Sequence, residues 1–230
     1  MIPAWSYWTV FDALERKFEA RRRVDRKWDV ILTGLLFARP SSKLVAEEIL
    51  PDLGYFHHRS GENVEFFCAG FSRYTRGRAY PDEKKVPSAD GPEPSWFYSD
   101  IAFNEFRREL SAEADWEYSG DPELVLTNAE FNTATGRMLL DFGTSIKLNL
   151  EKAKAGGAIA SVPNLFEKIF RFAETQPGND PTWGLSDKLA RDTGQNVLWN
   201  LVVGFLPESL RKDTQSVRHF LVTDLSAKSE

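Results

Sequence analysis

The sequence is poor in the residues that mark several large classes of protein. Its 230 residues include one cysteine, Cys68, and only three histidines. A single cysteine cannot close an intrachain disulfide. The opening residues, MIPAWSYWTV, also lack the basic start, apolar core and cleavage site of a secretory signal. We therefore expect a cytoplasmic protein whose fold does not depend on disulfides.

Long apolar runs and a strong charge of one sign are missing as well. The longest apolar stretch, at 197–206, is about half of the roughly 20 residues that a helix needs to cross a bilayer. The net charge of −5 gives no general attraction for nucleic acid or an anionic membrane, so such a partner would need a local basic patch. The sequence therefore predicts no membrane span.

The motifs of familiar enzymes are absent from the sequence. It contains no phosphate-binding glycine loop, no Gly-x-Ser-x-Gly and no His-Glu-x-x-His. His57 and His58 are adjacent, so their rings point in different directions, and no further ligand has a supporting spacing. Cys68 lies among aromatic residues, where burial would raise the pKa of its thiol. We expect no metal or cofactor, and no catalytic residue can be assigned.

What the sequence does have is enough apolar material for one sizeable core, since 42% of its residues are hydrophobic and 13% are aromatic. The apolar spacing predicts an α/β protein. Predicted strands cover 29–38, 64–71, 123–131 and 137–150, and predicted helices cover 9–23, 41–53, 99–110, 164–173 and 185–205. The proline-rich and arginine-rich stretch at 72–95 has little apolar content and is predicted to be a long loop outside the core.

The order strand, helix, strand, helix, strand, strand, helix resembles the thioredoxin-like fold. In that family a Cys-x-x-Cys motif begins the helix that follows the central strand. Here Arg39-Pro40-Ser41-Ser42 occupies that place, so disulfide exchange has no nucleophile. Asp121-Pro122-Glu123, just before the third strand, looks like the family's cis-proline that faces this turn.

The resemblance implies a redox-inactive βαβαββα core at 29–175. An N-terminal helical extension at 1–28 would precede it, and a C-terminal helical appendage at 176–230 would pack on it. A second resemblance concerns Tyr55-Phe56-His57-His58-Arg59-Ser60-Gly61 and Phe66-Phe67-Cys68-Ala69-Gly70-Phe71. These segments are similar to stretches of bacterial proteins, some of which are encoded near conflict and defence systems.

The first functional hypothesis is a non-catalytic protein-interaction or assembly subunit, in a bacterial defence or signalling system. It rests on Trp5, Tyr7 and Trp8, because large aromatic side chains near a terminus either dock on their own domain or become buried against a partner. Docking within the chain is the simpler interpretation. Association with a protein partner or with a second copy of the chain is the alternative that we carry forward.

The second hypothesis is a nucleotide or nucleic-acid sensor. Arginines interleaved with tyrosines can hold phosphates by ion pairing and bases by stacking. Acidic neighbours, Asp82 and Glu83, partly neutralise this patch, so solvated charges on a mobile loop are the simpler interpretation. The residues concerned are Arg73, Tyr74, Arg76 and Arg78.

The third hypothesis is an enzyme that handles an anion, for example by using glutathione, at the start of the predicted second helix. A helix N-terminus with basic groups suits an anion. The residues concerned are Arg39, Ser41, Ser42 and Lys43, with Pro122 facing them.

Overall fold

The structure is a computed structural model. It describes residues 1–22, 30–60, 64–87, 96–132, 135–174, 208, 219–223 and 225. The predicted appendage at 176–230 therefore lies outside the described residues except for 208, 219–223 and 225. None of the described helices is long and apolar enough to cross a membrane.

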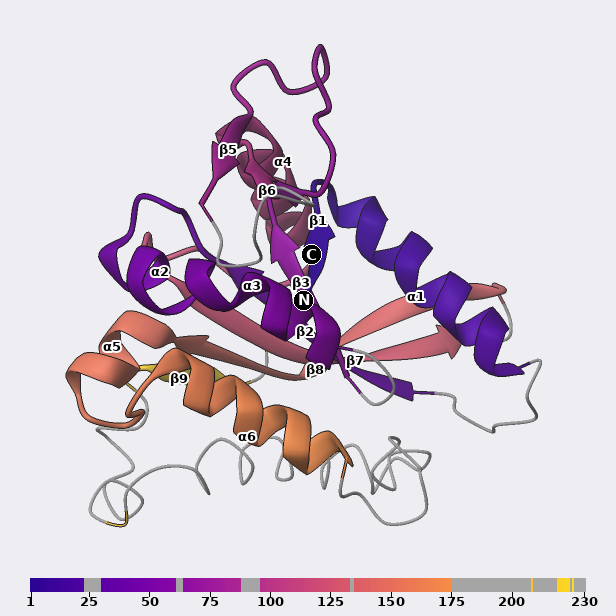
Figure 1. The fold of residues 1–230 in the computed structure, drawn as a ribbon. Helices are drawn as coiled ribbons and strands as arrows, with labels where there is room; N and C mark the ends of the chain where they lie inside the picture. Colours follow the sequence, from indigo (N-terminus) through magenta and orange to yellow (C-terminus); the bar gives the residue numbers. More distant parts are fainter. Residues whose placement is uncertain are drawn as a thin grey trace.

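The centre of the molecule is a mixed α/β sheet of six strands in the order β1-β3-β2-β7-β8-β9 (Figure 1). β1, β3 and β2 run parallel to one another, whereas β7, β8 and β9 are added by antiparallel pairing. The strands are β1 (Ile2–Ala4), β2 (Val30–Phe37), β3 (Val64–Ala69), β7 (Glu123–Asn132), β8 (Arg137–Asn149) and β9 (Leu221–Thr223). The predicted central strand is thus confirmed, because β2 lies between β3 and β7.

Helices cover both faces of this sheet. On one face, Tyr7 of α1 (Tyr7–Arg22) contacts Phe106 of α4 (Asp100–Glu113), and Phe106 contacts Phe37 of β2. On the other face, Phe166 packs against Phe56 and Phe66. Figure 1 shows the helices of this second face in front of the sheet. They are α2 (Lys43–Glu48), a 3₁₀ turn η1 (Leu50–Asp52), α3 (Leu53–Arg59) and α6 (Val162–Glu174), while α5 (Leu150–Ala155) follows β8.

A second, smaller sheet borders the stretch at 72–95 that the sequence predicts to be a loop, and one of its strands lies inside that stretch. Its order is β4-β6-β5, with antiparallel pairing throughout. The strands are β4 (Phe71–Ser72), β5 (Lys84–Val86) and β6 (Trp96–Tyr98). The side chains of Val86 and Trp96 are buried in the main core. The prediction that 72–95 contributes nothing to the core was therefore wrong, because a short strand with one buried valine gives no periodic pattern.

The N-terminal segment is integrated into the fold. β1 pairs with β3, and Tyr7, Val10 and Leu14 of α1 are buried in the same core as the central strand. The segment between β2 and β3 differs from the single predicted helix. Pro51 interrupts it at η1, and α3 then continues through Gly54 to Arg59. The predicted helix at 41–53 stops before Gly54, yet Gly54 is buried inside α3.

Candidate interaction surface

The stretch from Tyr74 to Glu83 is anchored to the body of the protein by two carboxylates. Asp82 accepts hydrogen bonds from the Ser99 hydroxyl (2.7 Å) and from the backbone N–H of Ile101 (3.1 Å) at the start of α4. Glu83 accepts from the Ser72 hydroxyl and from the backbone N–H of Arg76, each at 2.7 Å. These two residues therefore hold the loop in place. From the sequence they were expected only to neutralise part of the arginine charge.

The pKa values of both carboxyls reflect this role. Burial is the largest single effect on each and raises the pKa, but the hydrogen bonds from hydroxyl and backbone donors outweigh it. The pKa of Asp82 and that of Glu83 therefore lie below their usual values. Both groups are ionised at neutral pH, so the anchors are charge-assisted hydrogen bonds, which are stronger than neutral ones.

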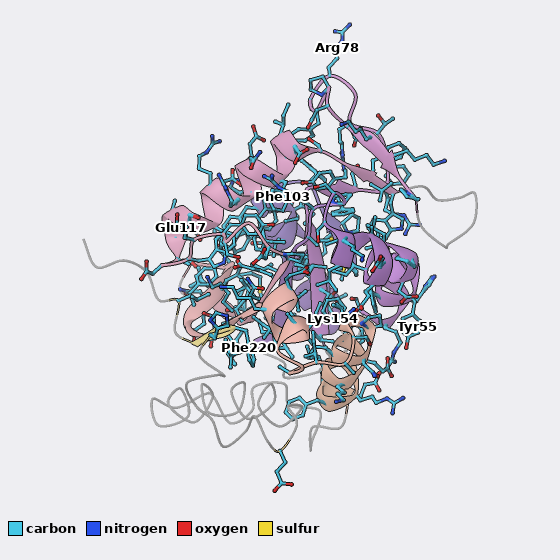
Figure 2. The ribbon with its side chains drawn as sticks, turned by 90° about the vertical axis from the view of Figure 1, so that its left-hand side faces the viewer. Tyr55, Arg78, Phe103, Glu117, Lys154 and Phe220 are labelled. Carbon is cyan, nitrogen blue, oxygen red and sulfur yellow. The ribbon has the colours of Figure 1, made fainter. Side chains whose placement is uncertain are left out.

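The three arginines of the loop do not form one patch. The Arg73 guanidinium lies 4.9 Å from the centre of the Trp96 ring, and Arg76 lies 4.6 Å from the centre of the Trp5 ring. Arg78 is exposed and stands at the tip of the loop (Figure 2). No ion pair between these arginines and another described residue is present. Their charges are consequently available to a partner, but in separate places.

The three N-terminal aromatic residues differ in how far their side chains are exposed. Tyr7 is 2% exposed and donates a hydrogen bond from its hydroxyl to Glu113 at 2.8 Å, so it docks within the chain and is not available to a partner. Trp5 is half-buried between Arg76 and Tyr80, whose ring centre is 6.1 Å from its own. Trp8 is 63% exposed in the first turn of α1. Of the three, Trp8 presents most of its ring to solvent.

We use the name loop surface for Trp5, Trp8, Tyr74, Arg76 and Arg78. The contact between Arg76 and Trp5 joins the loop to the start of α1. Tyr74 is 74% exposed, and its backbone is restrained by Glu83, which binds the N–H of Arg76 two residues later. Large aromatic side chains in water on a fixed backbone lose little conformational freedom when they bind, which favours association.

The turn after β2 is occupied by contacts of its own. The Arg39 guanidinium donates to Asn104 at 3.0 Å and lies 4.8 Å from the centre of the Phe103 ring. Lys43 forms an ion pair with Glu47 at 3.9 Å. α2 has six residues, and the hydroxyl of Ser42 makes no capping hydrogen bond; Ser41 is exposed. The Arg39 side chain therefore points toward α4 and not toward the start of α2.

Pro122 lies at the same end of the sheet as this turn. Glu123 pairs with Phe37 across β7 and β2, so the residues just before Glu123 and just after Phe37 are neighbours at one sheet edge. Pro122 is buried, and its carbonyl accepts a hydrogen bond from the N–H of Leu150 at 2.9 Å. The topology therefore brings the two segments to the same end of the sheet.

A buried carboxyl group at this edge was missed by sequence reasoning. Glu123 is fully buried and accepts hydrogen bonds from the Trp116 indole (3.2 Å) and the Ser119 N–H (3.4 Å), and Lys147 is 3.7 Å away. Burial raises the pKa of Glu123, and these neighbours oppose the shift. The only signal in the sequence is an acidic residue opening an otherwise apolar strand.

His57 is half-buried and Cys68 is buried, whereas His58 is exposed. His57 shares a hydrogen bond at 2.5 Å with the backbone carbonyl of Met1, and burial lowers its pKa. Cys68 is fully buried, which raises the pKa of its thiol and makes it a poor nucleophile. Within the described ranges, no group of three or more histidine, cysteine, aspartate or glutamate side chains could hold a metal ion.

Comparison with known proteins finds no relative of this chain. No family model, no curated protein and no solved structure matches the chain. The function therefore has to be argued from the geometry alone.

Proposed function

We propose that the protein is a non-catalytic interaction subunit built on a thioredoxin-like core that has no redox thiols. The order β3-β2-β7-β8 and its strand directions support this core, as does the helical crossover between the parallel strands β2 and β3. Arg39-Pro40-Ser41-Ser42 stands where the family's cysteines would be. The one cysteine of the chain is buried in β3.

The observation that carries the proposal is the exposure of Trp8 and Tyr74, which lie within three residues in the chain of the contacting pair Trp5 and Arg76. Tryptophan, tyrosine and arginine are the residues that contribute most to binding at protein interfaces. A soluble domain gains nothing from leaving such rings in water, whereas a partner that covers them removes apolar surface from solvent. The loop surface is therefore where we place a protein partner.

The partner is a protein, either another chain or a second copy of this one. The assembly that we propose is a bacterial defence or signalling complex, and this context rests on the resemblance of the segments around His57 and Cys68. The overall charge of −5 favours a protein over a polyanion, because a polyanion would be repelled by the molecule as a whole.

Substitution of the exposed rings tests this function. We expect the double variant Trp8→Ala and Tyr74→Ala to weaken self-association or co-purification of a partner at least tenfold, because two exposed interface rings are lost. Mass measured by light scattering after size exclusion, and quantitative pull-down from the native host, would show the effect. Leu139→Ala is the matched control, because Leu139 is 48% exposed on β8, well away from the loop in the chain. A monomeric wild type without a partner, or equal effects of both changes, would contradict the proposal.

The second candidate is a nucleotide or nucleic-acid sensor at the same loop. It is favoured by Arg73 and Arg76, whose guanidinium groups lie on tryptophan rings and form no ion pair with a described residue. An arginine held flat on an aromatic ring keeps its N–H edge free for an oxygen of a phosphate. The separation of the two arginines onto different tryptophans is what ranks this candidate second.

Salt dependence separates this candidate from the first. If the loop binds phosphates, affinity for a single-stranded oligonucleotide should fall steeply as salt rises. The double variant Arg76→Ala and Arg78→Ala should weaken binding several-fold and flatten that dependence, as read by fluorescence anisotropy. Lys43→Ala combined with Arg171→Ala removes the same total charge elsewhere and is the control. Oligonucleotide affinity that both double variants reduce equally, or leave unchanged, would eliminate the sensor.

A further inference from the structure

A groove that is separate from the loop surface runs along the outer side of α4. It has a volume of about 890 Å³ and lies between this helix and the segment at 116–118. Small-molecule sites commonly have volumes of about 300–1,000 Å³, so the groove falls within that range. Glu117, at the outer edge of the molecule in Figure 2, is one of the residues that line it. The side chains used below are Asn104, Glu105, Arg107, Arg108, Trp116 and Tyr118.

Two adjacent arginines line this groove. Neither Arg107 nor Arg108 forms an ion pair or a hydrogen bond through its side chain with any residue that the structure describes. In contrast, the carboxylate of Glu105, which also lines the groove, accepts a hydrogen bond from the Tyr80 hydroxyl at 3.2 Å. Two guanidinium groups with free N–H donors beside a cavity suit an anion with several oxygens, such as a phosphate.

Two aromatic residues, Trp116 and Tyr118, also line the groove. The Trp116 indole donates to the buried Glu123, and its ring centre is 4.4 Å from that of Phe37. The Tyr118 hydroxyl donates to the carbonyl of Gly120, and its ring centre is 5.3 Å from that of Phe103. Because Trp116 is only 2% exposed, Tyr118 is the ring that a ligand in the groove can contact, with Trp116 packed behind it in the core. The Tyr118 hydroxyl is already bonded within the chain, so the ring offers contact through its carbons, which suits a planar, apolar or aromatic group.

Further polar groups line the same groove. Arg39 donates to the side-chain oxygen of Asn104 at 3.0 Å, which orients the amide so that its N–H₂ group remains a donor. Ser111 supplies a hydroxyl to the groove, and Glu117 supplies a carboxylate. Carboxylates accept hydrogen bonds from hydroxyls and amines. The groove therefore combines an aromatic ring, hydrogen-bonding groups for both donors and acceptors, and a doubly cationic flank.

We propose that this groove binds a mononucleotide, with the base against Tyr118 and the phosphate at Arg107 and Arg108. A nucleotide carries all the groups that the groove can satisfy: a planar ring, ribose hydroxyls or ring amines for the carboxylate and amide, and an anion with several oxygens. A long nucleic acid fits less well, because Glu105 and Glu117 flank the arginines and would repel further phosphates. This site does not depend on the loop surface or on its partner.

Isothermal titration calorimetry of the full chain with AMP tests the site, with adenosine and inorganic phosphate as partial ligands. We expect AMP to bind at least tenfold more tightly than either fragment, because only AMP contacts both Tyr118 and the two arginines. The double variant Arg107→Ala and Arg108→Ala should reduce AMP affinity at least tenfold. It should leave adenosine binding unchanged, whereas Tyr118→Ala should weaken adenosine binding. Circular dichroism melting checks that each variant is folded.

The matched control is the double variant Arg137→Ala and Lys152→Ala, which removes the same charge from exposed positions of β8 and α5. It should leave AMP affinity unchanged. The proposal is overturned if AMP gives no heat of binding at millimolar concentration, or if phosphate alone binds as tightly as AMP. It is also overturned if the loop variant, Arg76→Ala with Arg78→Ala, abolishes AMP binding while the groove variant retains it, and that last result would instead support the nucleotide sensor at the loop. Loss of a protein partner in either variant has no bearing on the groove.

Discussion

Replacing Phe37 with alanine should lower the free energy of unfolding by about 3–5 kcal/mol, the cost typical of deleting a buried phenylalanine. Phe37 ends the central strand β2 and is fully buried. Its ring centre lies 4.4 Å from that of Trp116, 5.5 Å from Phe106 and 6.0 Å from Phe103. Alanine would leave a cavity among three large rings that cannot collapse into it. Urea denaturation followed by circular dichroism measures the change.

Phe37→Leu provides the control for this prediction. Leucine retains most of the volume, so the free energy of unfolding should fall by less than about 1.5 kcal/mol. A second effect separates packing from general destabilisation. Because Phe37 supports Trp116, the alanine variant should also shift the fluorescence of the folded state. Equal losses for alanine and leucine would mean that this cluster does not depend on the Phe37 ring.

Gly70→Ala should be the second most damaging of the substitutions considered. Gly70 has a φ of +79°, in the left-handed region, where a non-glycine residue costs about 1–2 kcal/mol. A Cβ atom there would lie 2.8 Å from Cβ of Phe103, and crowding in a packed core adds about 1–3 kcal/mol. The expected total is a loss of about 2–5 kcal/mol, measured as the free energy of unfolding in urea.

Gly77→Ala separates the two contributions. Gly77 also has a positive φ, +54°, but a Cβ atom added there would have nothing within 4 Å. We therefore expect only the backbone cost, at most about 2 kcal/mol. Gly70 is also fixed by two backbone hydrogen bonds, one to Ala4 of β1 and one from Ser99 before α4. If both variants lost the same stability, the contact with Phe103 would not be limiting.

The elements with strong periodic patterns could be predicted from the sequence. The continuous apolar run of β2, the paired strands β7 and β8, and the Ser99 cap of α4 all lie where residue spacing and capping preferences indicate. The Ser99 hydroxyl accepts from the N–H of Ala102 at 3.0 Å, as an N-cap residue should. These features depend on local sequence, so a local pattern is sufficient to find them.

The features that could not be predicted from the sequence depend on contacts between residues that are far apart in the chain. β5 is a strand only because it pairs with β6, with Lys85 opposite Phe97. The loop arginines looked like a single cluster, yet Arg73 and Arg76 pack on tryptophans that lie far apart in the sequence. The groove combines residues of α4 with the segment at 116–118, and its two free arginines look like ordinary surface charges on a helix. No spacing rule could have grouped them.

The outermost strands of the large sheet, β1 and β9, have three residues each. A short border strand offers few unpaired backbone groups, so it is a poor template for the addition of a strand from another molecule. The two described edges of the sheet are therefore poor sites for edge-to-edge strand pairing between molecules. A complex formed by this protein would then be held together by side chains, and its composition could change without rearranging the backbone of the sheet.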